Sequence, residues 1–186
     1  MIHLDHNAGS PLRPEARAAM LAALDAGGNA SAVHALGRRA KARLEDAREV
    51  VAAACGVASE RVIFTAGGTE ADALALHGRR VAAAAIEHPA VLAQPGVVAT
   101  LPVDAAGRVR AEAIGGHVAA GGADTVAVMA ANNETGVVQP VDAVRTSLPA
   151  GVRLHIDAVQ APGRLDLPAL AGLADTLALS AHKLGG

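Results

Sequence analysis

The pattern of hydrophobic and polar positions divides the chain into a helical first part and a remainder of short apolar runs. Residues 14–26, "PEARAAMLAALDA", begin with proline, which is favoured at the first position of a helix, and predict one helix. Residues 38–56 predict a second helix that ends at Gly56. Its expected apolar face comprises Ala40, Leu44, Ala47, Val51 and Ala54.

After residue 60 the pattern changes to six short apolar runs. They are "RVIFT" (61–65), "VAAAAI" (81–86), "VVATL" (97–101), "DTVAVMA" (124–130), "VRLHI" (152–156) and "TLALS" (176–180). Each is too short for an ordinary helix, and most are almost continuously apolar, as in strands buried on both faces. Because the runs alternate with helical or polar segments, the sequence predicts an α/β fold with a mainly parallel sheet covered by helices.

Glycine and polar residues lie at or shortly after the ends of five of these runs. They are Gly68 and Thr69, then Glu87 and His88, then Asn132 and Asn133, then Asp157 and Gln160, and finally Ser180, His182 and Lys183. In open α/β sheets, ligands bind beyond the carboxyl ends of the strands. The sequence therefore predicts a functional site at that edge.

Composition restricts the classes of protein and partner. The 186 residues suit one domain, or one domain and part of another, and 52% are hydrophobic, with Phe64 the only aromatic residue. A net charge of -2 without a basic run gives no sign of nucleic acid or an anionic membrane. The apolar runs are too short to span a membrane, and the first residues do not resemble a secretion signal. A single cysteine, Cys55, cannot form an internal disulfide, so we expect a cytoplasmic protein.

The glycine-rich segment 66–72, "AGGTEAD", links a predicted strand to a helix. Two glycines allow a tight turn, Thr69 and Asp72 resemble a capping box, and free amides at a helix start bind phosphate well. An ordinary turn and cap would use the same residues.

Asp157 and Lys183 have the chemistry to hold a pyridine aldehyde. A buried carboxylate needs a cation, and a protonated ring nitrogen at contact distance would gain on the order of 4 kcal/mol at an effective dielectric near 20. Partial burial favours the neutral lysine amine, which forms Schiff bases. The alternatives are a carboxylate that caps the next turn and a solvated lysine. With His88 to stack on a ring and Asn133 and Gln160 to donate to its oxygen, the set fits pyridoxal phosphate. We expect no metal site.

Six segments together resemble successive motifs of the cysteine desulfurases, within the class V aminotransferase family. They are "LDHNAGSPLRPEA", "FTAGGTEAD", "AIEHPAVL", "ANNETGVVQP", "HIDAVQAPG" and "LSAHKLGG", in order along nearly the whole chain. The resemblance implies the large domain of an aspartate aminotransferase-like, pyridoxal phosphate-dependent transferase, incomplete here. Residues 14–186 would form this cofactor-binding domain, truncated after the Schiff-base lysine, and residues 1–13 would join a small domain.

The resemblance also implies the role of each site residue. Lys183 would form the Schiff base, Asp157 would pair with the ring nitrogen, and Gln160 would bond the ring oxygen. His88 would stack on the ring and assist proton transfer, so Lys183 and His88 are the expected catalytic residues. Asn133 would contact the cofactor or the substrate carboxylate. The phosphate would be held by Gly68, Thr69, Ser180 and His182.

The implied reaction converts L-cysteine to L-alanine and passes the sulfur to an enzyme persulfide. Relatives are longer, so the nucleophilic cysteine and the arginine that binds the substrate are expected beyond Gly186, while Cys55 is expected to be buried and structural. A homodimer, a sulfur-acceptor protein and iron–sulfur cluster assembly are also implied. By itself, the 186-residue chain is expected to be inactive in sulfur transfer.

Three departures from the family pattern bear on substrate preference more than on cofactor binding. Residues 8–11 are "AGSP" where the family has "ATTP", residues 28–32 are "GNASA" where it has "GNPSS", and the segment 77–85 is shorter. Two alternatives remain open at this point. One is a selenocysteine lyase or another class V aminotransferase or lyase. The other is a non-catalytic fragment that acts with a separate second half.

Overall fold

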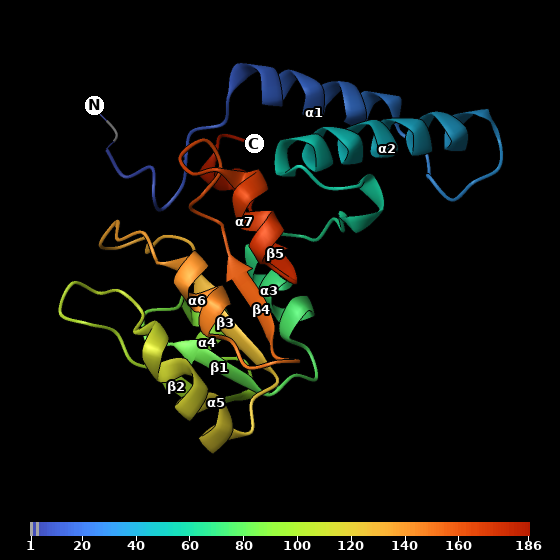
Figure 1. Cartoon of the computed structure of the whole chain (residues 1–186). Coiled ribbons are helices and arrows are strands. Elements are labelled where there is room, and N and C mark those ends of the chain that lie inside the picture. The colour runs from blue at the N-terminus through green and yellow to red at the C-terminus, as the bar shows by residue number, and fades with distance from the viewer. Residues whose placement is uncertain (1, 3) are drawn as a thin grey trace.

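The computed structural model describes residues 2 and 4–186, and it contains one parallel sheet of five strands (Figure 1). The strands are β1 (Val81–Ala84), β2 (Val97–Leu101), β3 (Thr125–Met129), β4 (Arg153–Asp157) and β5 (Thr176–Ala178), in the order β2-β1-β3-β4-β5. Every neighbouring pair is parallel. The predicted fold class, α/β with a mainly parallel sheet, is confirmed.

The register brings the carboxyl ends of the central strands to one level. Met129 of β3 pairs with Asp157 of β4, and Asp157 pairs with Ala178 of β5. β1 and β3 are buried along their whole lengths, as expected for strands covered on both faces. The segments that leave these strands therefore meet at one edge.

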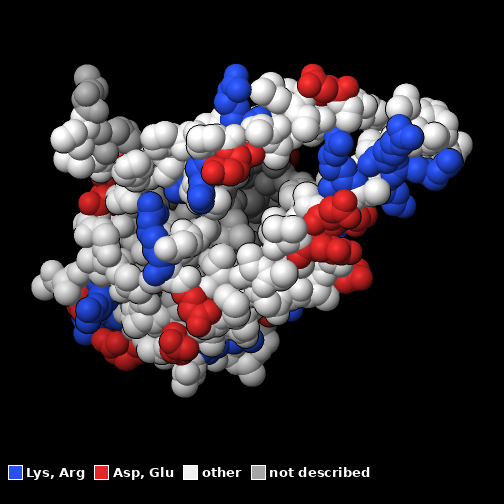
Figure 2. Space-filling view, turned by 90° about the horizontal axis from the view of Figure 1, so that it is seen from above, with Lys and Arg blue, Asp and Glu red and all other residues white. Residues whose placement is uncertain are grey.

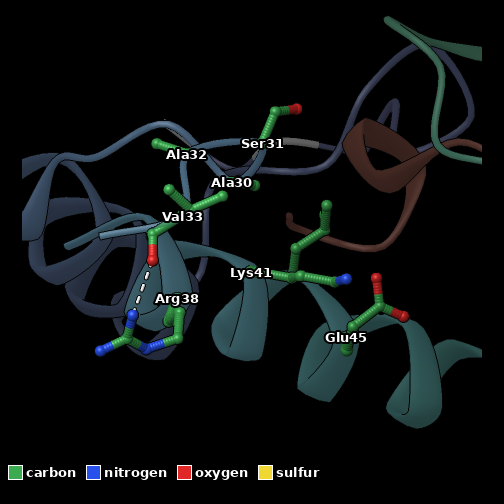
Figure 3. Close-up of a pocket in the computed structure, with 8 residues that line it drawn as sticks. Ala30, Ser31, Ala32, Val33, Arg38, Lys41 and Glu45 are labelled. Atoms are coloured by element: carbon green, nitrogen blue, oxygen red, sulfur yellow. Dashed lines mark hydrogen bonds between the residues drawn. The ribbon is translucent and has the colours of Figure 1, made fainter. Parts of the chain in front are cut away.

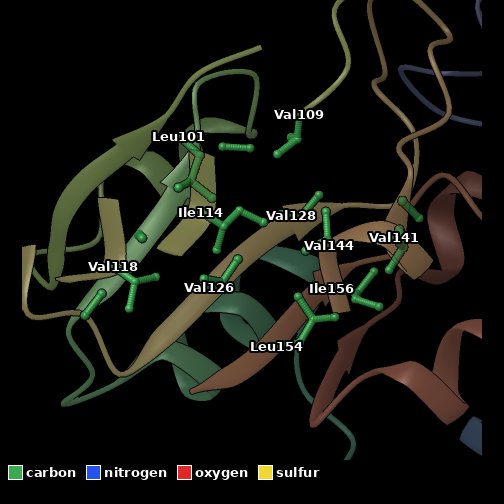
Figure 4. Close-up of a cluster of buried hydrophobic side chains, with 14 of the residues drawn as sticks. Leu101, Val109, Ile114, Val118, Val126, Val128, Val141, Val144, Leu154 and Ile156 are labelled. Carbon is green, nitrogen blue, oxygen red and sulfur yellow. The ribbon is translucent and has the colours of Figure 1, made fainter. Parts of the chain in front are cut away.

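Helices cover both faces of the sheet. α5 (Ile114–Gly121), α6 (Val141–Ser147) and α7 (Leu167–Leu173) pack on one face, against side chains that include Val126, Val128, Leu154 and Ile156 (Figure 4). α3 (Gly68–Leu76) and α4 (Pro89–Leu92) pack on the other face, through Leu76 and Val91. Three short 3₁₀ turns complete the described elements: η1 (Ser59–Arg61), η2 (Ala111–Ala113) and η3 (Ala181–Lys183).

Two long helices form an arm beside this layered unit. α1 (Pro14–Ala26) has the predicted bounds, and α2 (Ala35–Cys55) ends at Gly56, whose φ of 66° closes the helix in the left-handed conformation (Figure 1). α1 buries no residue. α2 buries only Gly37, Ala52 and Cys55, so the predicted apolar face was wrong and Leu44 is exposed.

The predicted strand at residues 61–65 is also wrong. Arg61 ends η1, and residues 62–65 have no regular secondary structure and pair with no strand in the described part of the chain; Ile63 and Phe64 are exposed. Arg48 of α2 covers it instead: its guanidinium lies 5.1 Å from the Phe64 ring centroid and donates to the Val62 carbonyl. β-branched and aromatic residues favour a strand, but a ladder also requires a partner.

Two further expectations concern membranes and the chain start. Within residues 2 and 4–186, no helix combines the length and hydrophobicity needed to cross a membrane. Of the predicted segment 1–13, Met1 and His3 lie outside the described residues.

Candidate functional site

A cavity of about 300 Å³ opens at the carboxyl edge of the sheet. All of the predicted site residues except Ser180 line it: Gly68, Thr69, His88, Asn133, Asp157, Gln160, His182 and Lys183. Ser180 contacts it through His182, because its Oγ lies 2.7 Å from His182 Nδ1. Asp72 and Met129 also line the cavity. The structure thus brings together side chains spread over more than a hundred residues of sequence.

One end of the cavity suits an anion. α3 begins at Gly68, and the first amides of a helix lack intrahelical acceptors. A Cβ on Gly68 would lie 3.0 Å from Val159 Cγ2 and 3.5 Å from Ser180 Cβ, so only glycine leaves this approach open. The predicted capping box is wrong: Gly67 is the N-cap and receives no side-chain cap, and Asp72 bonds His155 instead.

Two side-chain donors of the site bond the same backbone oxygen, the carbonyl oxygen of Asn7. Lys183 Nζ donates to the Asn7 carbonyl and, at 3.2 Å, to the Ala8 carbonyl. Gln160 Nε2 donates to the same Asn7 oxygen at 2.9 Å. The chain start is held along η3, where Ser10 Oγ donates to the Lys183 carbonyl at 2.9 Å. The predicted lysine and glutamine therefore converge, and a ligand oxygen could take the place of the backbone oxygen.

Asp157 provides a buried negative group at the centre of the site. Its Oδ1 accepts the Val159 amide at 2.9 Å, and only 7% of the residue is exposed. Burial raises the pKa of Asp157, and the nearby Asp72 raises it further, whereas the Val159 amide lowers it. A cation in the cavity would offset this cost, so the residue fits a protonated ring nitrogen.

His88 and Asn133 are oriented by their loops. The His88 ring accepts the Ala90 amide at Nδ1, 3.1 Å away, so a neutral ring carries its proton on Nε2. Asn132 is buried and builds the loop, since its Oδ1 accepts the amides of Glu134 and Thr135. The second asparagine of the pair, Asn133, is the one that lines the cavity.

Sequence reasoning missed three polar residues in and beside the cavity. From the sequence, Asp72 has only a capping role, Glu87 lies at a strand end without an assigned role, and His155 is not singled out, yet all three are buried. The available signal was position: Glu87 directly precedes His88, and His155 lies two residues before Asp157, on the same face of its strand.

A larger hollow of about 520 Å³ lies between residues 30–33 and α2 (Figure 3). It contains Lys41, and Arg38 Nη1 donates to the Val33 carbonyl at 2.6 Å. Basic side chains gather at the end of the molecule that carries this hollow (Figure 2). A separate depression in the surface lies near the centre of the same view. No strand end delivers residues to the hollow at Lys41 within the described chain, so size alone does not make it the functional site.

Comparisons with known proteins identify the family of this chain. The class V aminotransferase family model matches residues 2–186. The chain is 39% identical to an IscS-like cysteine desulfurase of Mycobacterium tuberculosis, covering 100% of this chain and 53% of that protein. It is also 39% identical to a cysteine desulfurase of Cereibacter sphaeroides, covering 100% of this chain and 52% of that protein.

Solved structures give the same relationship. A NifS-like protein from Rickettsia africae superposes with a TM-score of 0.90 at 30% identity, over 100% of this chain and 55% of that one. A structure described as SspA in complex with cysteine has a TM-score of 0.87 at 25% identity, over 100% of this chain and 58% of that one. The chain spans about half the length of the curated relatives it matches. Enzymes of this family depend on pyridoxal phosphate. The chain belongs to the class V aminotransferase family.

Proposed function

We propose that this chain forms the cofactor-binding part of a pyridoxal phosphate-dependent cysteine desulfurase. The proposed reaction converts L-cysteine to L-alanine and transfers the sulfur to an enzyme cysteine. The observation that carries the proposal is the shared cavity: Lys183 and Asp157 line it together with Gly68 at the start of α3. The similarity to proteins named cysteine desulfurase supports the choice of reaction.

The residues present fit the cofactor in three respects. The open approach at Gly68 suits a phosphate, and Thr69, Ser180 and His182 are the proposed polar partners. Asp157 is a buried acid that bonds the Val159 amide and, among the described residues, no cationic side chain, so it can pair with a protonated ring nitrogen. Gln160 offers an amide donor, and Lys183 an amine, at the same point.

In the proposed mechanism, the bound cofactor supplies an aldehyde and an electron-withdrawing ring. Asp157 keeps the ring nitrogen protonated, with an attraction of roughly 4 kcal/mol at an effective dielectric near 20. His88 stacks on the ring and donates or returns a proton at Nε2, because its Nδ1 is engaged by Ala90. Lys183 holds and moves a proton at Nζ, and Asn133 orients the cofactor or the substrate carboxylate.

Sulfur transfer requires a thiolate that Cys55 does not provide. Cys55 is only 5% exposed at the end of α2, and burial raises the pKa of its thiol, which disfavours the reactive anion. We therefore assign the nucleophile to a part of the natural protein outside these 186 residues. A structure described as SspA in complex with cysteine supports L-cysteine as the substrate.

The wider assignments follow from the same proposal. Residues 14–186 form the cofactor-binding domain, and residues 1–13 join a small domain. The protein acts in the cytoplasm as a homodimer and delivers sulfur to an acceptor protein, with iron–sulfur cluster assembly as the proposed pathway. Relatives named IscS support the last point.

The proposal is tested by covalent trapping of the cofactor. The sequence contains lysine only at positions 41 and 183, and it has no Trp or Tyr, so near-ultraviolet absorbance reports the cofactor almost alone. After incubation with pyridoxal phosphate and reduction with borohydride, peptide mass mapping should find the cofactor on Lys183. Lys183→Ala should abolish the label, whereas the matched variant Lys41→Ala should keep it.

Two results would contradict the proposal. One is a label on Lys41 in place of Lys183, and the other is an unchanged absorption spectrum in Lys183→Ala. The reaction itself is tested on the full natural protein by measuring sulfide and alanine from L-cysteine. Turnover of L-selenocysteine without turnover of L-cysteine would support the alternative lyase instead.

A further inference from the structure

Three buried acidic side chains gather beside the cavity. Asp72 of α3, Glu87 before α4 and Asp157 at the end of β4 are only 1%, 4% and 7% exposed. A buried carboxylate is costly unless it is protonated or paired with a cation. Three in one place therefore require an arrangement that controls which of them carries the charge.

His155 is bonded to one of the three. It lies two residues before Asp157 on β4, so both side chains point to the same face of the sheet. The ring is fully buried: Nε2 lies 3.1 Å from Asp72 Oδ1, and Nδ1 lies 2.9 Å from Thr176 Oγ1 of β5. With both nitrogens engaged, the ring can carry two protons and balance the charge of Asp72.

Asp72 connects this pair to the site. Its carboxylate bonds His155 on the buried side, and the residue also lines the cavity with Asp157. A change of charge on the pair is therefore felt at Asp157 through a low-dielectric region, where electrostatic effects are stronger than in water.

Glu87 occupies the remaining position. Its Oε1 accepts the Met129 amide at 2.6 Å, a group left free because β1 ends at Ala84. Its Oε2 is buried and has no hydrogen-bond partner among the residues that the structure describes. Burial raises the pKa of Glu87 well above its ordinary value, and Asp157 and Asp72 raise it further. This shift favours the neutral, protonated form of the carboxyl.

We propose that Asp72 and His155 are positioning residues that act through Asp157. A doubly protonated His155 neutralises Asp72, and Asp157 is then the single uncompensated anion facing the cofactor's ring nitrogen. This inference rests on the proposed cofactor function. The other titratable groups around Asp157 are Glu87 and His88 and, around the cavity, His182 and Lys183.

The variant His155→Gln separates charge from hydrogen bonding. Glutamine keeps amide donors for Asp72 but cannot carry a positive charge. Asp72 would then be uncompensated and would oppose ionisation of Asp157, which holds the cofactor. We expect pyridoxal phosphate to bind about tenfold more weakly, the change that corresponds to one pKa unit. The dissociation constant is measured by equilibrium dialysis and near-ultraviolet absorbance.

The loss should depend on pH in a defined direction. A raised pKa for Asp157 leaves it protonated at low pH and ionised again at high pH. The deficit of His155→Gln should therefore shrink as pH rises and Asp157 becomes ionised in the variant as well.

A double variant tests the coupling. Asp72→Asn combined with His155→Gln removes both charges, so it should recover most of the affinity lost in His155→Gln. Wild-type affinity in His155→Gln at every pH would overturn the inference, as would an equal loss in the single and double variants, which would indicate a packing defect. Far-UV circular dichroism confirms folding.

Two further measurements keep the outcomes distinct. In the wild-type protein, nitrogen NMR of labelled histidine should show both ring nitrogens of His155 protonated at neutral pH, and a neutral ring would overturn the inference without any variant. Asp157→Asn should weaken cofactor binding more than His155→Gln does. If Asp157→Asn binds the cofactor with normal affinity, the proposed function fails. If only His155→Gln does so, the proposed function stands and the positioning role of Asp72 and His155 fails.

Discussion

The arm and the layered unit use similar residues but bury them very differently. α1 and α2 together span more residues than the five strands, yet α1 buries none and α2 buries three. The sheet residues Val126, Leu154 and Ile156 are completely buried. Met20, Leu21 and Leu24 of α1 are exposed.

The difference shows where the stability of this chain resides. Burial of apolar surface drives folding, at roughly 25 cal/mol per Å², so the layered unit supplies most of the stabilisation and holds the site. The arm is kept helical by local signals, such as Pro14 and Gly56, and by a few surface contacts. Matched substitutions in the two regions should therefore have unequal effects.

The largest difference is expected for leucine truncation. Leu154→Ala removes a completely buried side chain from the core and should cost about 2–5 kcal/mol of unfolding free energy. Leu24→Ala, at a position 73% exposed, should change it by less than about 0.5 kcal/mol. Urea unfolding followed by far-UV circular dichroism measures both. Equal losses would show that the arm is stabilised by contacts as strong as those of the core.

A smaller difference is expected for two glycines with the same steric problem. A Cβ on Gly96, before β2, would lie 2.1 Å from the Arg79 carbonyl oxygen, and a Cβ on Gly37, in α2, would lie 2.1 Å from the Ala32 carbonyl oxygen. Gly96→Ala should cost about 1–3 kcal/mol because the sheet cannot shift. Gly37→Ala should cost under about 1 kcal/mol, because the surface loop can move and alanine favours the helix. Thermal unfolding measures both losses, and a larger loss in Gly37→Ala than in Gly96→Ala would contradict this expectation.

The smallest difference concerns two ion pairs. Burial alone would raise the pKa of Asp175, but the Leu154 amide and Arg145, each 2.8 Å away, outweigh it and lower that pKa below its ordinary 3.8. The stability contributed is therefore present at neutral pH and is lost as pH falls through the lowered pKa. The side chain is partly exposed, so Asp175→Asn should cost at most about 1 kcal/mol at neutral pH and almost nothing near pH 3.

The control for that prediction lies in the arm. Glu45 and Arg48 are three residues apart on α2, with 3.1 Å between Oε2 and Nε. Glu45→Gln should cost only about 0.3 kcal/mol, as is usual for such pairs. Urea titrations at both pH values compare the two. A pH-independent loss in Asp175→Asn would show that hydrogen bonding to Leu154, rather than charge, stabilises the sheet there.

Much of the fold could be predicted because its signals are local. Pro14 marks the start of α1, Gly56 ends α2, and continuous apolar runs gave five of the six expected strands. The failures required information from distant residues. Nothing in "RVIFT" reveals that a pairing strand is lacking among the described residues, and the face that α2 buries depends on its neighbours, including Pro168 beside Gly56.

The candidate site divides in the same way. Residues at strand ends, such as Asp157 and Lys183, could be predicted, because parallel strands bring their carboxyl ends to one edge. The pair formed by Asp72 and His155 could not, since these residues are 83 positions apart and meet only when α3 packs against β4. Without that packing, Asp72 looks like a helix cap and His155 like an ordinary strand residue.

The carbonyl of Asn7 introduces a competition for the two donors that it accepts. Lys183 and Gln160 both bond this oxygen, so a ligand atom that takes the same donor hydrogens competes with it. The measured affinity for such a ligand is its intrinsic affinity multiplied by the fraction of molecules in which the Asn7 carbonyl has released these donors. Occupancy of the cavity and the hydrogen bonds to the Asn7 carbonyl therefore belong to one equilibrium.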